Sequence, residues 1–380
     1  MACDWIPWAK PTLYGDETDA VVDALRSTWI SGGPYVDSFE NQIALRLDSP
    51  YAIAVSNGTT ALHLAFLGLG IGPGDEVIVP GFTFVAAANM ALAVGANLVF
   101  ADVDPSTWLL EPASVARVIS PRTRAIVAVH LYGNVADMDA LLEIAGEHRA
   151  ALVEDAAEAA FSRYKGRSAG TMGHVGTLSF QATKTITTGE GGMVLTGDER
   201  MFRRMVLLRD HGMRQDKRYW HDVVGYNYRL TNLQAALGCA QLRHLDTIRA
   251  ERARVHRTYR NCLADAHNFQ QQLFNEDVDA LLWTFAGRIA SADCDIDKLE
   301  ARRDAIMHIM KERGIETRPG FYALSSLSPY NCPELPNARR IAASVISLPT
   351  YPSLADQTIE RICDELRHAL DLVVGHEIQS

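Results

Sequence analysis

The chain has 380 residues, of which 48% are apolar and 22% are charged, and its net charge at pH 7 is −10. This length and composition indicate a globular protein of about two domains that buries a large core without disulfides or structural metals. The acidic balance argues against nucleic acid as the main partner, because a phosphate backbone needs a basic surface, but it allows a small phosphorylated substrate.

The cysteines and the apolar segments indicate the cellular setting. No two of the six cysteines stand at C-x-x-C spacing, so neither a zinc site nor a redox site is expected. Scattered free thiols are typical of a reducing cytoplasm. The first residues carry no apolar signal segment, and no apolar run reaches the length of a membrane span. We therefore expect a soluble cytoplasmic protein that makes no membrane contact.

Residues 50–200 alternate between short apolar runs and helical stretches. Continuous apolar strands that alternate with helices indicate an α/β fold with a mostly parallel sheet, covered on both faces. Helices are predicted at 61–69, 85–94 and 138–148. Strands are predicted at 51–55, 76–79, 98–101, 125–129, 151–153, 178–180 and 193–195.

The pattern changes at residue 233. Residues 233–263 are strongly helical and charged, and a smaller α/β region follows them. In that region a strand is predicted at 283–289, with helices at 298–313 and 357–373. We place the domain boundary on the long helix, which gives a large domain with an N-terminal arm at 1–240 and a small C-terminal domain at 241–380.

The segment SNGTT at 56–60 follows a predicted strand and opens a helix. The free amides in the first turn of a helix attract an anion, and Gly58 lets the backbone come close to it. Thr59 and Thr60 add hydroxyl donors. An Asn-Gly turn with a threonine cap is an equally good interpretation of this segment alone. The segment is not a Walker loop, since no Gly-Lys-Ser/Thr follows.

Two further candidates follow predicted strands. Asp155 comes directly after the strand at 151–153, where ligands bind in open parallel sheets, although a helix N-cap is the alternative. Lys184 lies beyond Ser179 among small, uncharged side chains, where an amine can act as a nucleophile. An isolated lysine, however, is usually solvated surface.

The combination of these features is more specific than any of its members. An anion-binding helix start, an acid at a strand end and a lysine beyond a serine form the set that pyridoxal phosphate needs. The lysine would make the Schiff base, and the acid would keep the pyridine nitrogen protonated so that the ring withdraws electrons. The helix start and its hydroxyls would hold the phosphate.

With these motifs the chain closely resembles the DegT/StrS-like sugar aminotransferases, which have the aspartate aminotransferase fold (fold type I). The resemblance covers nearly the whole chain. It implies a large domain with a mostly parallel sheet of the seven-stranded type covered by helices, followed by a smaller α/β domain. The motifs are VSNGTTALHLA at 55–65, GPGDEVIVPGFTFVA at 72–86, VHLYGNVADMD at 129–139, EDAAEA at 154–159, SFQATKTITTGEGGM at 179–193 and GYNYRLTNLQAALG at 225–238.

The resemblance implies roles for residues around the cofactor ring. Lys184 matches the Schiff-base lysine of the family, and Asp155 matches the partner of the pyridine nitrogen. Glu158 falls at a variable position near the ring hydroxyl. Phe84 matches the aromatic residue that stacks on the ring; without the resemblance it would be read as a core aromatic.

The resemblance also implies how the phosphate is held. Thr59, Thr60 and Ser179 match phosphate ligands, and Gly58 lies among them. Asn227 matches a residue that the family donates from the second subunit, so the resemblance implies a homodimer with shared active sites. Taken alone, Asn227 would be read as a turn residue.

The implied reaction moves an amino group from glutamate to a keto sugar on a nucleoside diphosphate, a step in the biosynthesis of deoxyamino sugars and polysaccharides. Some relatives carry histidine at the lysine position and act as dehydratases, so Lys184 favours transamination. Its amine would move the proton between the substrate carbon and the cofactor carbon. Arg229 is a candidate for the donor's carboxylate, and a surface or interface salt bridge is the alternative.

Several residues fall in segments that resemble the substrate entrance of the family and could equally be packing residues. They are Trp29, Ser31, Gly32, Phe321 and Tyr322.

Two other interpretations stay open. One is a synthase of the same fold that acts on a non-sugar cyclic ketone or an aminohydroxybenzoate-type ring. The other is a regulatory relative that binds the cofactor without turnover, against which the presence of both Lys184 and Asp155 argues. Residues 264–296 resemble the family least, so the sugar, the nucleotide and the aminated carbon are not predicted.

Overall fold

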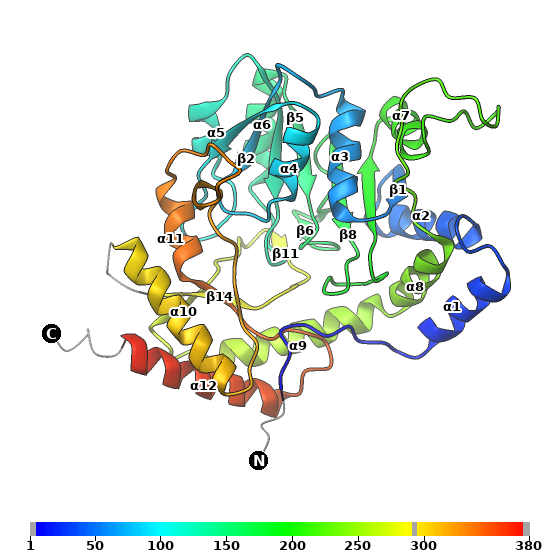
Figure 1. The fold of residues 1–380 in the computed structure, drawn as a ribbon. Coiled ribbons are helices and arrows are strands. Elements are labelled where there is room, and N and C mark those ends of the chain that lie inside the picture. The colour runs from blue at the N-terminus through cyan, green and yellow to red at the C-terminus, as the bar shows by residue number, and fades with distance from the viewer. Residues whose placement is uncertain (1–4, 291–294, 375–380) are drawn as a thin grey trace.

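The computed structural model describes residues 5–290 and 295–374. Its centre is a seven-stranded sheet in the order β1-β9-β8-β5-β4-β2-β3 (Figure 1). Strand β9 runs antiparallel to both its neighbours, and the other adjacent pairs are parallel. The mostly parallel sheet expected from the sequence is therefore confirmed. Its strands are β1 (Tyr51–Val55), β2 (Glu76–Pro80), β3 (Asn97–Ala101), β4 (Thr123–Val129), β5 (Ala151–Asp155), β8 (Val175–Ser179) and β9 (Gly192–Thr196).

Helices pack against this sheet and bury its apolar strands. Helix α3 begins at a capping box, in which Asn57 Oδ1 accepts from Thr60 N at 2.8 Å and Thr60 Oγ1 accepts from Asn57 N at 3.2 Å. It ends at Gly70, whose φ of 74° is the left-handed conformation of a helix C-cap. The helices are α3 (Gly58–Leu69), α4 (Ala86–Ala93), α5 (Pro112–Val118), α6 (Met138–His148) and α7 (Glu199–Arg209).

The helix expected at 233–263 is interrupted. Helix α8 (Asn232–Arg243) and helix α9 (Leu245–Cys262) meet at His244. The His244 ring stacks on Tyr14 at 4.7 Å, and its Nε2 lies 2.7 Å from Asp16 Oδ1. The interruption therefore lies at a contact with the N-terminal segment, which local periodicity does not reveal. The N-terminal helices that pack on α8 are α1 (Asp16–Arg26) and α2 (Pro34–Leu47).

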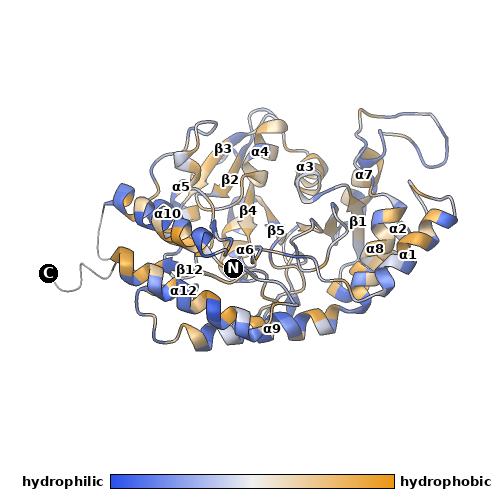
Figure 2. Cartoon of the chain, turned by 60° about the horizontal axis from the view of Figure 1, so that its bottom comes forward, coloured by the Kyte–Doolittle hydropathy of each residue, from blue (hydrophilic) through white to orange (hydrophobic). Residues whose placement is uncertain are grey.

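The C-terminal part has its own four-stranded antiparallel sheet, in the order β10-β12-β14-β13, and its own hydrophobic core. Helices α9, α10 and α12 carry both apolar and polar residues (Figure 2), and their apolar side chains enter this core. The division at residue 240 stays a prediction. The elements are β10 (Phe269–Gln271), β12 (Ala286–Ile289), β13 (Arg318–Pro319), β14 (Val345–Ser347), α10 (Ile296–Glu312), the 3₁₀ helix η1 (Leu324–Ser326), α11 (Pro336–Ser344) and α12 (Asp356–Val374).

A third, small sheet ties the two parts together. It pairs β11 (Val278–Asp279) with β6 (Arg163–Tyr164), and β6 with β7 (Arg167–Ser168). Within the described ranges, no helix combines the length and the apolar character needed to span a bilayer.

Candidate active site

A cavity of about 880 Å³ lies where parallel strands of the large sheet end. Val129, Asp155 and Ser179 are the last residues of β4, β5 and β8, and all three line it. In open parallel sheets this edge is where ligands bind. The C-terminal part contributes residues 318–321, and the N-terminal segment contributes Trp8. The site is thus built from three separate regions of the chain.

The start of α3 forms a cradle of donors on one side of the cavity. The first backbone N–H groups of a helix have no intrahelical acceptor, so those of Gly58 and Thr59 are available to a ligand. A Cβ at Gly58 would lie 2.9 Å from the Ser179 Cβ, so only glycine lets these two segments meet. The Thr60 hydroxyl donates to the Asn57 carbonyl at 2.9 Å and so belongs to the cap. A phosphate suits this cradle, because the helix is 12 residues long and its N-terminus is positive.

Asp155 is buried at the end of β5, with 7% of its surface exposed. Its Oδ1 accepts from Ala157 N at 3.1 Å, and among the described residues its Oδ2 has no donor. Burial raises the pKa of this carboxyl, although the charge of Lys184 acts in the opposite direction. A protonated ring nitrogen would supply the missing donor and stabilise the carboxylate.

Lys184 and Glu158 face each other in the cavity. The Lys184 Nζ lies 3.6 Å from Glu158 Oε1, and 3.9 Å from the centroid of the Trp283 ring. Glu158 Oε2 accepts from Tyr132 N at 3.2 Å. The amine is therefore held between a carboxylate and the electron-rich face of an indole, both of which favour a cation.

Burial raises the pKa of Glu158 to about 7, and the charge of Lys184 opposes this increase. In the unfolded chain this carboxyl ionises near its ordinary value of 4.5, so between the two values the native state binds the extra proton. The stability that this group contributes is complete below the lower value and is lost as the pH rises through the higher one.

We therefore expect Glu158→Gln, which mimics the protonated form, to flatten the pH dependence of unfolding. Between about pH 5 and 7 the wild type should lose up to about 3 kcal/mol of unfolding free energy relative to the variant. Urea unfolding of both proteins, freed of cofactor, at several pH values measures this difference. Parallel curves across that range would contradict a raised pKa.

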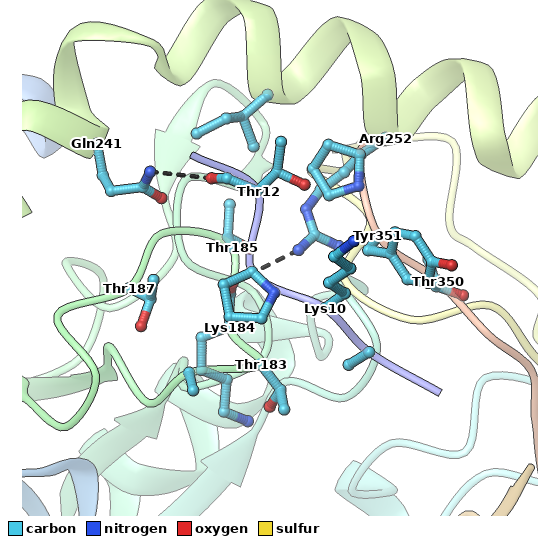
Figure 3. Close-up of a pocket in the computed structure, with 15 residues that line it drawn as sticks. Lys10, Thr12, Thr183, Lys184, Thr185, Thr187, Gln241, Arg252, Thr350 and Tyr351 are labelled. Carbon is cyan, nitrogen blue, oxygen red and sulfur yellow. Dashed lines mark hydrogen bonds between the residues drawn. The ribbon is translucent and has the colours of Figure 1, made fainter. Parts of the chain in front are cut away.

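The backbone of Lys184 is held from behind by Arg252 of α9 (Figure 3). Arg252 Nη2 donates to the Lys184 carbonyl at 3.5 Å, and Nη1 donates to the Trp283 carbonyl at 2.5 Å. Burial lowers the pKa of this guanidinium to about 10. A cavity of about 10 Å³, roughly the size of one water molecule, lies beside these groups. Arg252 thus fixes the lysine and the indole relative to each other.

Aromatic rings form another wall of the cavity. Phe84 is 54% exposed, which fits a side chain that borders a cavity rather than a core residue. Its ring centroid lies 5.9 Å from that of Phe321, which lies nearly parallel to Tyr132 at 6.2 Å. Tyr132 is in turn nearly parallel to Trp283 at 6.4 Å. A flat ligand therefore has aromatic partners on this side.

The predicted site residues divide into two groups. The first lines this one cavity: Gly58, Thr59, Thr60, Phe84, Asp155, Glu158, Ser179, Lys184 and Phe321. The second does not line it in the same chain: Trp29, Ser31, Gly32, Asn227, Arg229 and Tyr322.

The second group lies mostly at the surface. Arg229 forms an ion pair with Asp210, and Asn227 is exposed nearby on the same segment. The Trp29 side chain is 64% exposed, while its carbonyl accepts from Asn232 at the start of α8. Ser31 and Gly32 follow it in the same exposed loop. Tyr322 points elsewhere, with its ring 5.4 Å from the Arg303 guanidinium.

Sequence reasoning missed four cavity residues: Trp8, Tyr132, Trp283 and Arg318. Tyr132 lies in the motif VHLYGNVADMD, where its φ of 60° already marks an unusual position. The other three come from the N-terminal segment and the C-terminal part, and no local motif connects them with Lys184.

Comparisons with known proteins agree with this geometry. Residues 11–367 match the DegT/DnrJ/EryC1/StrS aminotransferase family. The GDP-perosamine synthase of Caulobacter vibrioides is 40% identical over 370 residues, which is 95% of this chain and 97% of the relative. The putative sugar aminotransferase Spr1654 from Streptococcus pneumoniae, in its PMP-form, superimposes with a TM-score of 0.92 at 26% identity over 98% of this chain and 100% of that one. DesV of S. venezuelae, in complex with a ketimine intermediate, gives a TM-score of 0.88 at 35% identity over 96% and 98% of the two chains.

Proposed function

The chain belongs to the DegT/DnrJ/EryC1/StrS aminotransferase family, and from this premise we propose that it moves an amino group from glutamate to a keto sugar carried on a nucleoside diphosphate. It is an aminotransferase that depends on pyridoxal phosphate. The 40% identity to a GDP-perosamine synthase makes a GDP-linked keto sugar the first substrate to test. The observation that carries the proposal is the meeting of Lys184, Asp155 and the α3 cradle in one cavity.

The residues of the cavity fit the cofactor. The cradle of Gly58, Thr59 and Ser179 would hold its phosphate, and the unmatched oxygen of Asp155 would face the ring nitrogen. Phe84 would lie against the ring. When bound there, the cofactor supplies an electron-withdrawing ring that stabilises negative charge on the substrate carbon.

Lys184 would both attach the cofactor and carry the proton. Its amine lies next to Glu158, whose pKa near 7 lets it take up or release a proton at neutral pH. Trp283 and Arg252 keep the amine and its backbone in place while the proton moves. Tyr132 N–H orients Glu158 from the other side.

The test is a panel of keto sugars linked to GDP, UDP or dTDP, assayed with glutamate by mass spectrometry of the product. The first half of the reaction is followed separately, as the change in visible absorption when glutamate alone is added. Amination of a cyclic ketone without a nucleotide would instead favour a ring synthase. A spectrum of bound cofactor that glutamate leaves unchanged would favour a regulatory protein.

We further propose that the protein acts as a homodimer in the cytoplasm. A large exposed apolar surface indicates a partner, and the exposed side chains include Trp29 at 64%, Tyr219 at 76% and Val224 at 88%. Asn227 and Arg229 lie beside this surface, not in their own cavity, and can reach the partner's site. The described cysteines are free, as is typical of a reducing compartment.

This assembly predicts that two inactive chains restore each other. If Asn227 serves the partner's cavity, a dimer of one Lys184→Ala chain and one Asn227→Asp chain has one site with both defects and one with neither. Activity should return to about half of the wild-type value per mixed dimer. The assay is the glutamate-dependent reaction after the two chains are coexpressed with different tags and the mixed dimer is purified.

A second mixture provides the control. Lys184 and Asp155 line the same cavity of one chain, so mixing Lys184→Ala with Asp155→Ala leaves one lesion in each site and should restore nothing. If the Asn227 mixture is equally inactive, Asn227 does not act across the interface.

A further inference from the structure

The charges in the cavity leave one cation without an assigned task. Its charged lining residues are Asp155, Glu158, Glu190, Lys184 and Arg318. Both substrates of the proposed reaction are anions, since glutamate has two carboxylates and the nucleotide sugar has two phosphates. The three acids repel such groups, and Lys184 is engaged in proton transfer.

Arg318 is held in a defined orientation at this wall. Its guanidinium carbon lies 4.3 Å from the centroid of the Trp8 ring, so it stacks on the indole. Its Nε and Nη2 donate to Glu316 Oε1 at 3.2 and 2.9 Å. Glu316 Oε2 in turn accepts from Trp8 N at 2.9 Å. One edge of the guanidinium is therefore fixed by Glu316 and one face by Trp8.

The other edge has no protein partner. Among the residues that the structure describes, no acceptor lies within hydrogen-bond distance of Nη1. A stacked guanidinium with an open edge suits a carboxylate or phosphate, because two parallel N–H groups match two oxygens. Arg229, which the sequence indicated for the donor's carboxylate, is paired with Asp210 outside this cavity.

We propose that Arg318 binds an anionic group of a substrate, either a carboxylate of the amino donor or a phosphate of the nucleotide. This assignment rests on the proposed function, because the reaction defines which anions enter the cavity. The two half-reactions use the same cavity in turn, so one arginine can serve either substrate.

The experiment compares Arg318→Gln with the wild type in each half-reaction. We expect KM for the substrate that Arg318 binds to rise by at least about tenfold, as for the loss of a charge-assisted hydrogen bond, while kcat changes by less than about threefold. Isothermal titration separates the two sources without turnover, with glutarate as the dicarboxylate and GDP as the diphosphate. Weaker glutarate binding assigns the donor, and weaker GDP binding assigns the nucleotide.

Three further variants distinguish anion binding from a structural role. Arg318→Lys keeps the charge but loses the planar pair of donors, so it should recover only part of the affinity. Glu316→Gln removes the competing carboxylate, so anion binding should be retained or become tighter. If Arg318 merely anchors Trp8, Glu316→Gln should instead weaken binding as Arg318→Gln does.

Arg117→Gln is the matched control. Arg117 is also a half-exposed arginine paired with a glutamate, Glu111 at 3.0 Å, but it does not line the cavity. Its loss should leave both half-reactions unchanged. Unaltered binding of both glutarate and GDP by Arg318→Gln, in an enzyme whose wild type is active, would overturn the assignment of Arg318 alone. Inactivity of the wild type with every donor and sugar nucleotide would instead overturn the proposed function.

Discussion

Replacing Lys184 by alanine should lower turnover by at least about a thousandfold, because both the attachment of the cofactor and the transfer of the proton depend on this amine. The amine lies 3.6 Å from Glu158, and no other lysine lines the cavity. Single-turnover kinetics with glutamate measure the loss. Borohydride reduction of the wild type should fix the cofactor to the peptide that contains Lys184.

Lys165→Ala is the control for this prediction. Lys165 is an exposed lysine whose Nζ lies 2.8 Å from Asp139 Oδ2, outside the cavity, so its removal should leave turnover unchanged. A cofactor label on any other lysine, or near-normal turnover of Lys184→Ala, would show that the assignment is wrong.

Replacing Asp155 by alanine should reduce turnover by at least about a hundredfold, which is the size of effect expected when one preorganised electrostatic contact is lost. Without this carboxylate, nothing at the end of β5 would keep the ring nitrogen protonated. The variant should still bind cofactor through Lys184 and the α3 cradle. Its absorption spectrum and its rate with glutamate, measured together, separate lost binding from lost reactivity.

A purely structural role for Asp155 has a close analogue in the same chain. Asp137 caps α6 by accepting from Ala140 N at 3.1 Å, much as Asp155 accepts from Ala157 N. Asp137→Ala should cost about 1 kcal/mol of unfolding free energy, as for the loss of a helix cap, and should leave turnover intact. If Asp155→Ala behaves in the same way, Asp155 is only a turn residue.

Much of the large domain was predictable because its signals are local. Continuous apolar runs mark the parallel strands, and the segment SNGTT carries the capping box that starts α3. Asp155 and Ser179 stand at strand ends, and the ends of neighbouring parallel strands meet at one edge of a sheet. The order of these motifs was therefore enough to indicate the fold, the cofactor and the candidate lysine.

The structure alone decided which distant residues surround that lysine. Trp283, Arg252 and Trp8 come from segments far apart in the sequence, and they meet near Lys184 or its cavity because the C-terminal part folds back onto the large domain. The interruption of the helix at His244 likewise depends on Tyr14 and Asp16, some 230 residues earlier.

The same reason explains the arginines. From the sequence, Arg229 stood in a family motif and Arg318 in none, since hydrophobic periodicity and short motifs report only on neighbours along the chain. Folding paired Arg229 with Asp210 and placed Arg318 on Trp8 at the wall of the cavity. Sequence thus determined the local elements and the chemistry they carry, whereas packing between the two parts of the chain decided which charges face the substrate.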